Sequence, residues 1–290
     1  MKPAPFAYKA PETLSETLVL LREHGDEGKL LAGGQSLIPV MNFRLAQPAV
    51  LIDLNNVAGL ADIWRDEAGH LHIGSMVRQR RLDRDALVAE CAPLITATMP
   101  YIAHPQIRNR GTIGGSLAHA DPAGELPVLA VALEAQFRLQ KEGSQRWVDA
   151  EAFYEGLFQT ALADDEILTE IKLPPLPAGS RFAFKELARR HGDYAQAGIA
   201  AVLQLDESGI CRAARLVFLN AGEIPMVASS AAAMLVGQRL TPELCAAAAA
   251  QAARDEIAPA GDVHASAEYK RHLAGVLAKR ALLEAAGLNS

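Results

Sequence analysis

The chain has 290 residues, of which 50% are hydrophobic and 21% charged, so it can bury a sizeable core and is long enough for more than one lobe. Its formal net charge of −6 argues against a general nucleic-acid-binding protein, because such proteins usually carry a surplus of basic residues. No apolar run is long enough for a membrane span, and the start of the chain lacks the apolar stretch of a secretory signal, so the expected location is the cytoplasm.

The three cysteines, Cys91, Cys211 and Cys245, are widely spaced. This pattern is typical of free thiols in a reducing compartment, and it cannot supply the four local thiolates of an iron–sulfur cluster. The histidines include no H-E-x-x-H arrangement. His70 and His72 share one face of an expected strand. Two solvated strand histidines are a better explanation of this pair than a metal site, so no metal ligand is assigned.

The first part of the chain, residues 1–57, is expected to form a small α/β lobe. A helix over 15–25 carries leucines at helical spacing and ends at a glycine. The strand that follows this helix runs directly into Gly33-Gly34-Gln35-Ser36. The expected strands lie at 6–8, 29–32 and 50–54.

A second lobe is expected over 58–176, because Pro174-Pro175-Leu176-Pro177 marks a plausible boundary. Helical spacing predicts a single helix over 82–98, and a stretch rich in proline and glycine follows from 104 to 127. The other elements expected here are strands at 70–74, 135–139 and 166–173 and an apolar helix at 126–133.

The remaining part, 177–290, is expected to begin with strands and to end in helices. An alanine run at 246–250 is a good helix former. Apolar residues recur at helical spacing between 269 and 281, which indicates a helix with one buried face. The strands are expected at 182–185, 198–205 and 212–220.

Two glycine pairs carry the strongest chemical signal: Gly33-Gly34 directly after a strand, and Gly114-Gly115 in the central stretch. Adjacent glycines let the backbone approach a ligand closely, and successive amide groups form an anion-binding concavity. The hydroxyls of Ser36, Thr112 and Ser116 can add donors. Two such loops can grip the two phosphates of one dinucleotide, although each pair taken alone also fits an ordinary turn.

The second glycine pair leads into L-A-H-A-D-P-A-G-E-L-P (117–127) ahead of an apolar helix. Asp121 and Glu125 can accept hydrogen bonds from ribityl or ribose hydroxyls, and as acidic residues before a helix they can also serve as caps. The motifs G-x-G-x-x-G, G-x-x-x-x-G-K-[ST] and G-x-S-x-G are absent, which disfavours a Rossmann domain, a P-loop enzyme and a hydrolase with a nucleophile elbow.

The motifs A-G-G-Q-S-L-I-P (32–39) and T-I-G-G-S-L-A-H-A-D-P-A-G-E-L-P (112–127) together resemble those of the FAD-binding medium subunits of molybdenum hydroxylases. That family includes the carbon monoxide dehydrogenase flavoprotein and the flavin domain of xanthine dehydrogenase. The resemblance covers nearly the whole chain. Weaker matches are F-x-Y-x-A-P (6–11), N-F-R-L-A-Q-P (42–48), R-R-H-G-D-Y-A (189–195) and E-Y-K-R-H-L-A-G-V-L-A-K-R-A (268–281).

The resemblance implies an α+β protein. A vanillyl-alcohol-oxidase/PCMH-type FAD-binding fold of two lobes would be followed by a C-terminal α+β lobe, in which a three-stranded sheet carries a helical bundle. One FAD would lie non-covalently between the lobes. The implied cofactor-binding residues are Leu31, Ala32, Gly33, Gly34, Gln35, Ser36, Leu37, Ile102, Thr112, Ile113, Gly114, Gly115, Ser116, Asp121, Glu125, Leu168, Lys185 and Tyr194.

Within this set the resemblance implies different roles. Residues 31–37 and 112–116 would contact the pyrophosphate, and Ile102 would lie near the isoalloxazine or adenine. Tyr194 would lie against the flavin ring, with a core tyrosine of the C-terminal lobe as its alternative. Lys185 would stabilise negative charge on the reduced ring, with a surface salt bridge as its alternative.

The implied function is that of an electron-transfer subunit with no catalytic side chain of its own. Substrate would be oxidised at a molybdopterin centre on a large subunit, and electrons would cross two iron–sulfur clusters on a small subunit, reduce this FAD and leave to an external acceptor. The expected assembly is a dimer of heterotrimers without nucleic acid or membrane span. A stand-alone FAD-dependent oxidoreductase and a non-enzymatic scaffold are the alternatives.

The chain also departs from the carbon monoxide dehydrogenase pattern. Gln35 stands where those proteins carry histidine, Ser116 where they carry asparagine, and His119-Ala120-Asp121 differs from their A-N-G-D stretch. These departures favour an N-heterocycle or an aldehyde over carbon monoxide as the substrate of the complex.

Overall fold

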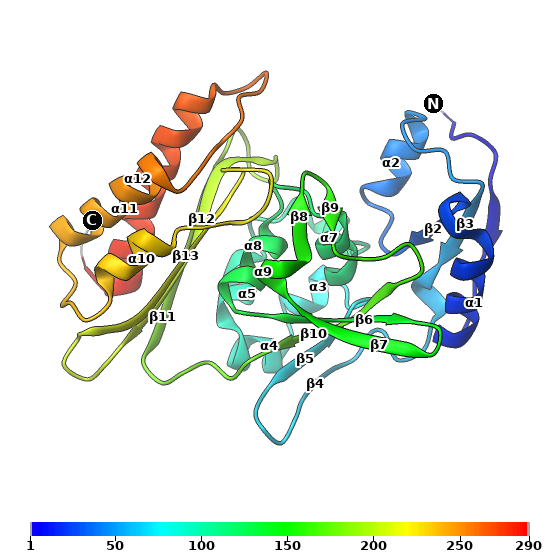
Figure 1. Cartoon of the computed structure of the whole chain (residues 1–290), viewed down its shortest axis with the longest axis horizontal. Helices are drawn as coiled ribbons and strands as arrows, with labels where there is room; N and C mark the ends of the chain where they lie inside the picture. Colours follow the sequence, from blue (N-terminus) through cyan, green and yellow to red (C-terminus); the bar gives the residue numbers. More distant parts are fainter. Residues whose placement is uncertain (1, 289–290) are drawn as a thin grey trace.

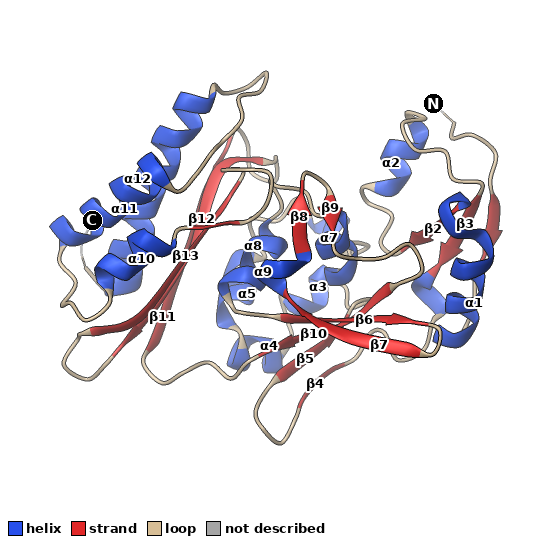
Figure 2. Ribbon diagram, in the orientation of Figure 1, coloured by secondary structure: helices blue, strands red, loops and turns tan. Residues whose placement is uncertain are grey.

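The computed structural model describes residues 2–288, and its three main sheets follow one another along the long axis of the molecule (Figure 1). The N-terminal sheet lies at one end, and the three last helices lie at the other (Figure 2). The large middle sheet and the short helices beside it separate them. Helices and strands are mixed throughout, as expected for an α+β protein.

The first lobe has a parallel three-stranded sheet in the order β1-β3-β2. Its helix α1 begins at a capping box between Thr13 and Glu16 and ends at Gly25, whose φ is 48°. The elements are β1 (Ala7–Lys9), α1 (Leu14–His24), a 3-10 turn η1 (Gly25–Glu27), β2 (Gly28–Leu31), α2 (Leu37–Asn42), β3 (Val50–Asp53) and a 3-10 turn η2 (Leu54–Asn56).

One small hydrophobic core fills the space between α1 and this sheet. Leu18 and Leu21 of α1 meet Val50 and Ile52 of β3 there. Ile167, which is 1% exposed and comes from the middle sheet, completes the same cluster. The first lobe therefore relies on a residue far along the chain to fill its interior.

The second lobe is an antiparallel five-stranded sheet in the order β4-β5-β10-β6-β7, with a small β8–β9 hairpin beside it. Short helices cover one of its faces (Figure 1) and enclose the largest core of the protein. The strands are β4 (Ile63–Arg65), β5 (Leu71–Gly74), β6 (Gln136–Lys141), β7 (Ser144–Asp149), β8 (Tyr154–Gly156), β9 (Gln159–Thr160) and β10 (Ile167–Leu173).

The prediction of a single helix over 82–98 is wrong, because the segment is divided among three short helices. The Asp85 side chain accepts hydrogen bonds from the amides of Leu87 and Val88 and so starts a new helix. Pro93 starts another, since it lacks an amide hydrogen and fits a first turn. The helices of this lobe are α3 (Gln79–Leu82), α4 (Ala86–Cys91), α5 (Pro93–Thr98), α6 (Pro105–Arg108), α7 (Ile113–His119), α8 (Glu125–Ala132) and α9 (Ala150–Phe153).

The C-terminal lobe has an antiparallel sheet in the order β11-β12-β13-β14. The three long strands expected from the sequence are present, and the two-residue β14 extends them at the edge. Its elements are β11 (Ser180–Ala188), β12 (Ala195–Leu205), β13 (Cys211–Leu219), β14 (Met226–Val227), α10 (Ser229–Leu235), α11 (Pro242–Asp255) and α12 (Ala267–Ala286).

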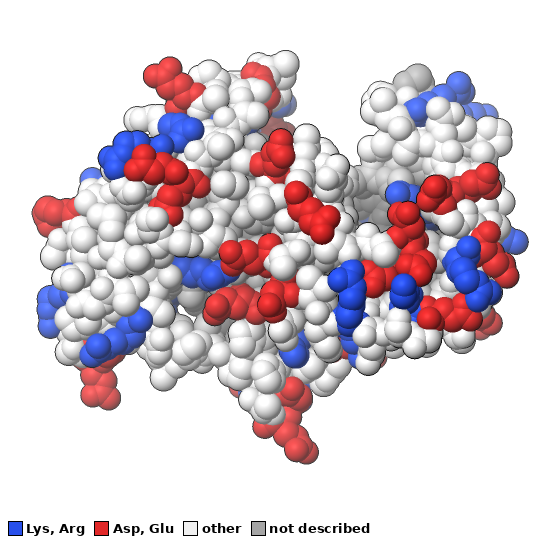
Figure 3. All heavy atoms as spheres, viewed as in Figure 1, with Lys and Arg blue, Asp and Glu red and all other residues white. Residues whose placement is uncertain are grey.

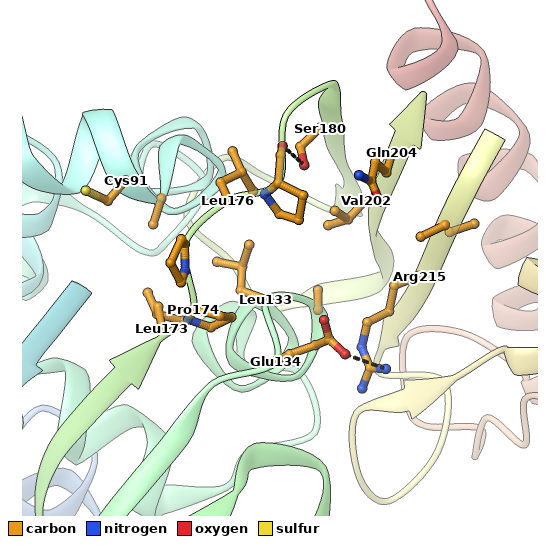
Figure 4. Close-up of a pocket in the computed structure, with 16 residues that line it drawn as sticks. Cys91, Leu133, Glu134, Leu173, Pro174, Leu176, Ser180, Val202, Gln204 and Arg215 are labelled. Atoms are coloured by element: carbon orange, nitrogen blue, oxygen red, sulfur yellow. Dashed lines mark hydrogen bonds and ion pairs between the residues drawn. The ribbon is translucent and has the colours of Figure 1, made fainter. Parts of the chain in front are cut away.

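Both faces of this sheet are buried, since Ile199 and Ala201 belong to the core under the helices and Ala200 to the core of the second lobe. Arg215 of β13 crosses the second face and donates to the carbonyl of Val131 at 2.8 Å. A cavity of about 180 Å³ lies at the same junction beneath the linker at 174–177 (Figure 4). The C-terminal sheet thus packs directly against the second lobe and shares its core.

Within residues 2–288, no helix combines the length and the apolar character needed to cross a bilayer.

Candidate functional site

The two glycine motifs lie directly against each other. A Cβ atom on Gly33 would lie 2.5 Å from the Arg110 carbonyl oxygen and 2.8 Å from the Cα of Gly111. A Cβ atom on Gly115 would lie 3.3 Å from the Cβ of Ala32. The structure therefore brings the first motif of the first lobe onto the second motif of the second lobe, with no room for side chains between them.

The first motif offers a row of free hydrogen-bond donors. The backbone amides of residues 33–37 have no acceptor among the residues that the structure describes. Gly34 adopts a φ of 72°, which turns this loop between β2 and α2. Successive free amides in such a turn form an anion-binding concavity. The loop is therefore suited to hold a diphosphate.

The second motif plays a different part, because its amides are already used. Gly114 donates to the carbonyl of Ser75 at 2.8 Å, and Gly115 donates to the Thr112 hydroxyl at 3.1 Å. Thr112 is thereby the N-cap of α7 and is 2% exposed. The second motif therefore packs closely against its surroundings, while the free amide donors suited to a phosphate lie in the first motif. The predicted contact of the second motif with a phosphate stays a prediction.

A hydrogen-bond network behind the first motif was not anticipated from the sequence. The Asn55 side chain donates to the carbonyl of Ala32 at 3.1 Å and accepts from Arg78 at 2.5 Å. The Asp53 carboxylate accepts hydrogen bonds from the backbone amide of Asn55 at 2.9 Å and from the Tyr8 hydroxyl at 2.5 Å. The sequence held a signal for this network, because β2 and β3 are parallel, so that the residues at their carboxyl ends must lie side by side at one end of the sheet.

Replacing Asn55 by alanine is expected to lower the free energy of unfolding by about 1–2 kcal/mol, because the half-buried Ala32 carbonyl and the Arg78 guanidinium each lose a partner. Urea denaturation measures this change. Asn109→Ala is the matched control, since exposed Asn109 also accepts from an arginine, Arg80 at 2.8 Å, and should change stability by less than about 0.5 kcal/mol. Equal losses in both variants would contradict an anchoring role for Asn55.

Positive charge gathers beside the free amides. The Arg78 guanidinium also donates to the carbonyl of Arg110, so these two residues are neighbours at the glycine motifs. Burial, followed by the charge of Arg110, lowers the pKa of Arg78. Two cations in mutual repulsion favour the approach of an anion, which adds to the case for a phosphate-binding site.

A second group of predicted residues meets at the junction with the C-terminal lobe. Burial raises the pKa of Glu125 to about 7, and the Asp121 charge adds to the rise. Partial desolvation, followed by the charges of Asp121 and Glu125, raises the pKa of Tyr194, although the residue as a whole is 68% exposed. Asp121 also accepts from the Ala123 amide at 2.9 Å, so its turn-forming role is present as well.

Glu186 joins this group and was missed in the sequence. Burial raises its pKa to about 8, and the Glu125 charge contributes. Its Oε2 atom is buried and has no hydrogen-bond partner among residues 2–288. Glu186 lies opposite Gly198 in the sheet, on the face that meets the second lobe. Four ionisable side chains from three segments thus converge where an FAD ring and ribityl chain were expected.

Lys185 does not belong to this group. It lies opposite Ile199, on the helix-bearing face of the sheet, and forms an ion pair with Glu284 of α12. Alternation along β11 separates it from Glu186. Of its two interpretations, the salt bridge with a surface carboxylate is the one observed, and the predicted stabilisation of a reduced ring by Lys185 is not supported by this placement.

The other predicted residues divide into loop and core positions. Gln35 donates to the carbonyl of Gly33 at 3.0 Å, and Ser36 and Leu37 begin α2. Leu31 ends β2, with its side chain beside Gly34, and Ser116 lies in α7. Ile102, Ile113 and Leu168 are 6%, 3% and 5% exposed and belong to the core of the second lobe, so their cofactor contacts stay predictions.

The surface is hollowed between α2 of the first lobe and the β8–β9 hairpin of the second (Figure 3). Phe158 at the tip of that hairpin is 52% exposed, and its ring centroid lies 5.2 Å from that of His119, the last residue of α7. Leu157 beside it is 53% exposed. No group of three or more His, Cys, Asp or Glu side chains suited to a metal ion occurs within the described residues.

Comparisons with known proteins agree with this geometry. Residues 4–176 match the family described as FAD binding domain in molybdopterin dehydrogenase, and residues 182–285 match the CO dehydrogenase flavoprotein C-terminal domain. The chain is 39% identical to the 6-hydroxypseudooxynicotine dehydrogenase complex subunit alpha of Paenarthrobacter nicotinovorans, covering 98% of this chain and 96% of that one. It is 40% identical to the nicotine 6-hydroxylase medium subunit of the same organism, covering 98% and 99%.

Among solved structures, a chain of carbon monoxide dehydrogenase from Hydrogenophaga pseudoflava is similar, with a TM-score of 0.95 and 39% sequence identity over 99% of both chains.

Proposed function

Because the chain belongs to the family of FAD-binding medium subunits of molybdopterin-dependent dehydrogenases, we propose that it receives electrons from iron–sulfur clusters of a partner subunit and passes them to an external acceptor. The chain is thus an FAD-binding oxidoreductase subunit. The two-lobed PCMH-type fold with its C-terminal lobe, expected from the sequence, is confirmed by the same similarities.

The observation that carries the proposal is the loop of free amides at 33–37, seated against the second glycine motif. These amides, with Arg78 and Arg110 beside them, would hold the diphosphate of FAD. Bound FAD would supply reversible exchange of one or two electrons. The side chains near Tyr194 would then face the remaining parts of the cofactor, between the lobes proposed at 1–57 and 58–176.

The chain's own residues would contribute binding, orientation and proton storage. Asp121 and Glu125 would accept hydrogen bonds from ribityl hydroxyls, and the Tyr194 ring would orient the flavin. Glu125 and Glu186 have pKa values of about 7 and about 8, so each can hold a proton on a carboxyl oxygen near neutral pH. No acid–base chemistry on an organic substrate is required of them.

The proposed electron transfer requires partner subunits. The three cysteines of this chain are free, and two of them, Cys211 and Cys245, are buried, so clusters would have to come from another chain. The large exposed apolar side chains near the hollow, Leu157 and Phe158, suit a surface that a partner covers. We propose a small iron–sulfur subunit and a large molybdopterin subunit, assembled as a dimer of heterotrimers in the cytoplasm.

An N-heterocycle or an aldehyde is the proposed substrate class of that complex. The relatives named for nicotine and 6-hydroxypseudooxynicotine act on nitrogen-containing organic compounds, and Gln35 and Ser116 depart from the carbon monoxide dehydrogenase pattern. The substrate would bind on the large subunit, so no residue of this chain is assigned to its recognition.

The test is a visible absorption spectrum and a mass-spectrometric inventory of the protein purified gently from its native source. A flavin spectrum with iron–sulfur absorbance and two companion chains is the expected result. Flavin without companions would replace the proposal by the stand-alone oxidoreductase. Absence of flavin, even after addition of FAD, would overturn FAD binding itself.

A further inference from the structure

Asn220, directly after β13, joins three segments that are distant in the sequence. Its backbone amide donates to the carbonyl of Pro122 at 2.7 Å, and its side-chain amide donates to the carbonyl of Ala195 at 2.7 Å. Its Oδ1 accepts from the Lys270 ammonium at 3.3 Å. Asn220 has a φ of 51°, a left-handed conformation that asparagine tolerates better than most residues.

The two carbonyls that Asn220 binds lie next to proposed flavin contacts. Pro122 follows Asp121 in the loop that leads to Glu125, and Ala195 follows Tyr194. One residue thus fixes the start of β12 relative to the loop after α7, through its side chain to Ala195 and its backbone amide to Pro122. The side-chain amide can both donate to Ala195 and accept from an ammonium, whereas a carboxylate lacks the donor and an apolar side chain lacks both groups.

Lys270 is the unusual member of this arrangement. It lies in the first turns of α12, and its side chain is 4% exposed. A buried ammonium is costly unless it is paired, and its partners are Asp262, at 2.7 Å, and Asn220. The bond from Lys270, followed by hydrogen bonds from nearby backbone amides, lowers the pKa of Asp262 to about 2. An apolar residue would fill the same volume of the helix–sheet interface at less cost, so packing alone does not account for this lysine.

We infer that Lys270 and Asn220 are positioning residues of the flavin site, holding the 121–125 segment and Tyr194 in a fixed relation to each other. This inference rests on the proposed function. The ammonium orients the Asn220 side chain, because it occupies Oδ1 and leaves the side-chain NH2 group directed at Ala195. Neither residue is assigned to the cofactor itself, so both act through the two backbone carbonyls.

Two variants test the interactions of Lys270 and of Asn220 separately. Lys270→Met keeps the length of the stem and removes the ammonium, and the partner left behind, Asp262, is 43% exposed and can be hydrated. Asn220→Asp keeps an acceptor for Lys270 but removes the donor to Ala195. Lys279→Met is the matched control, since Lys279 is exposed on the same helix.

The full chain in its native complex is used for the first measurement. Both variants are expected to bind FAD roughly tenfold or more weakly, because each loses one hydrogen bond that fixes the two segments, and to change the visible circular dichroism of the bound flavin. The control should match the wild type in both. In the chain without FAD, hydrogen exchange of peptides covering 121–125 and 194–195 should be faster in both variants, while far-ultraviolet circular dichroism remains that of the wild type.

The positioning inference would be overturned if both variants had the FAD affinity, flavin dichroism and hydrogen exchange of the wild type. The proposed function would remain intact in that case. Failure of the wild type to bind FAD would instead overturn the proposed function. Should Lys270→Met not fold, Asn220→Asp, which retains the ammonium and its Asp262 partner, decides the inference alone.

Discussion

Replacing Gly33 by alanine is expected to weaken FAD binding strongly. The new Cβ atom would lie 2.5 Å from the Arg110 carbonyl oxygen and 2.8 Å from the Cα of Gly111, and neither backbone atom can rotate away as a side chain would. The two glycine motifs must then separate, at about 1–3 kcal/mol for overpacking, and the free amides of the first loop move with them. We expect FAD affinity to fall about 100-fold, measured by fluorescence titration.

A second alanine, at Gly114, tests a different contact, the packing of the second motif on Ser75 of its own lobe. Its Cβ would lie 2.4 Å from the Cβ of Ser75 and 2.7 Å from the Ser75 carbonyl oxygen. Gly156→Ala is the control, because its Cβ would meet only the flexible end of Gln159, at 3.3 Å. Full flavin occupancy in Gly33→Ala would show that cofactor binding does not depend on close packing of the first motif against residues 110–111. Full occupancy in Gly114→Ala would show the same for the packing of the second motif on Ser75.

The protein is expected to become less stable as pH rises from about 5 to about 8. Glu125 and Glu186 have pKa values of about 7 and about 8 in the folded chain, well above the ordinary value of a glutamate. Between the ordinary value and these raised values the folded state binds more protons than the unfolded state, so the free energy of unfolding falls as pH increases. At about 1.4 kcal/mol per pKa unit, the two groups together should lower it by up to about 6 kcal/mol between pH 5 and pH 8.

Urea denaturation of the FAD-free chain at pH 5 and pH 8 measures this fall. Glu186→Gln cannot ionise, so it should flatten the profile and be more stable than the wild type at pH 8. Glu207→Gln, in an exposed turn, should leave the profile unchanged. Carboxylates whose pKa is lowered, such as Asp206 and Glu166, act below about pH 4.5 and do not obscure the window. A wild-type profile for Glu186→Gln would contradict its burial in protonated form.

The sequence predicted the parts of the site that are local. Gly33 and Gly114 were identified because close backbone approach requires glycine within a short motif, and the strands around them followed from their apolar pattern. Asp53 and Asn55 could have been added by noting that β2 and β3 are parallel neighbours. The helix breaks at Asp85 and Pro93 were missed because apolar residues keep a helical spacing across both.

The parts that depend on distant segments could not be predicted. Lys185 and Glu186 are adjacent, and only the three-dimensional structure shows which of them faces the second lobe, since both faces of the C-terminal sheet are buried. The same holds for Asn220, whose three partners come from a loop, a strand and a helix. Polar residues in a strand or helix give no sign of such partners.

The position of Ile167 limits how segments can be exchanged between members of the family to make chimeric proteins. This residue of β10 completes the core of the first lobe around Leu18 and Leu21. A chimera that takes residues 1–57 from another member of the family would therefore meet a foreign side chain at this position and lose stability through a void or an overlap. Co-transferring residue 167 is expected to restore it. The unit that can be recombined is thus a discontinuous set of residues.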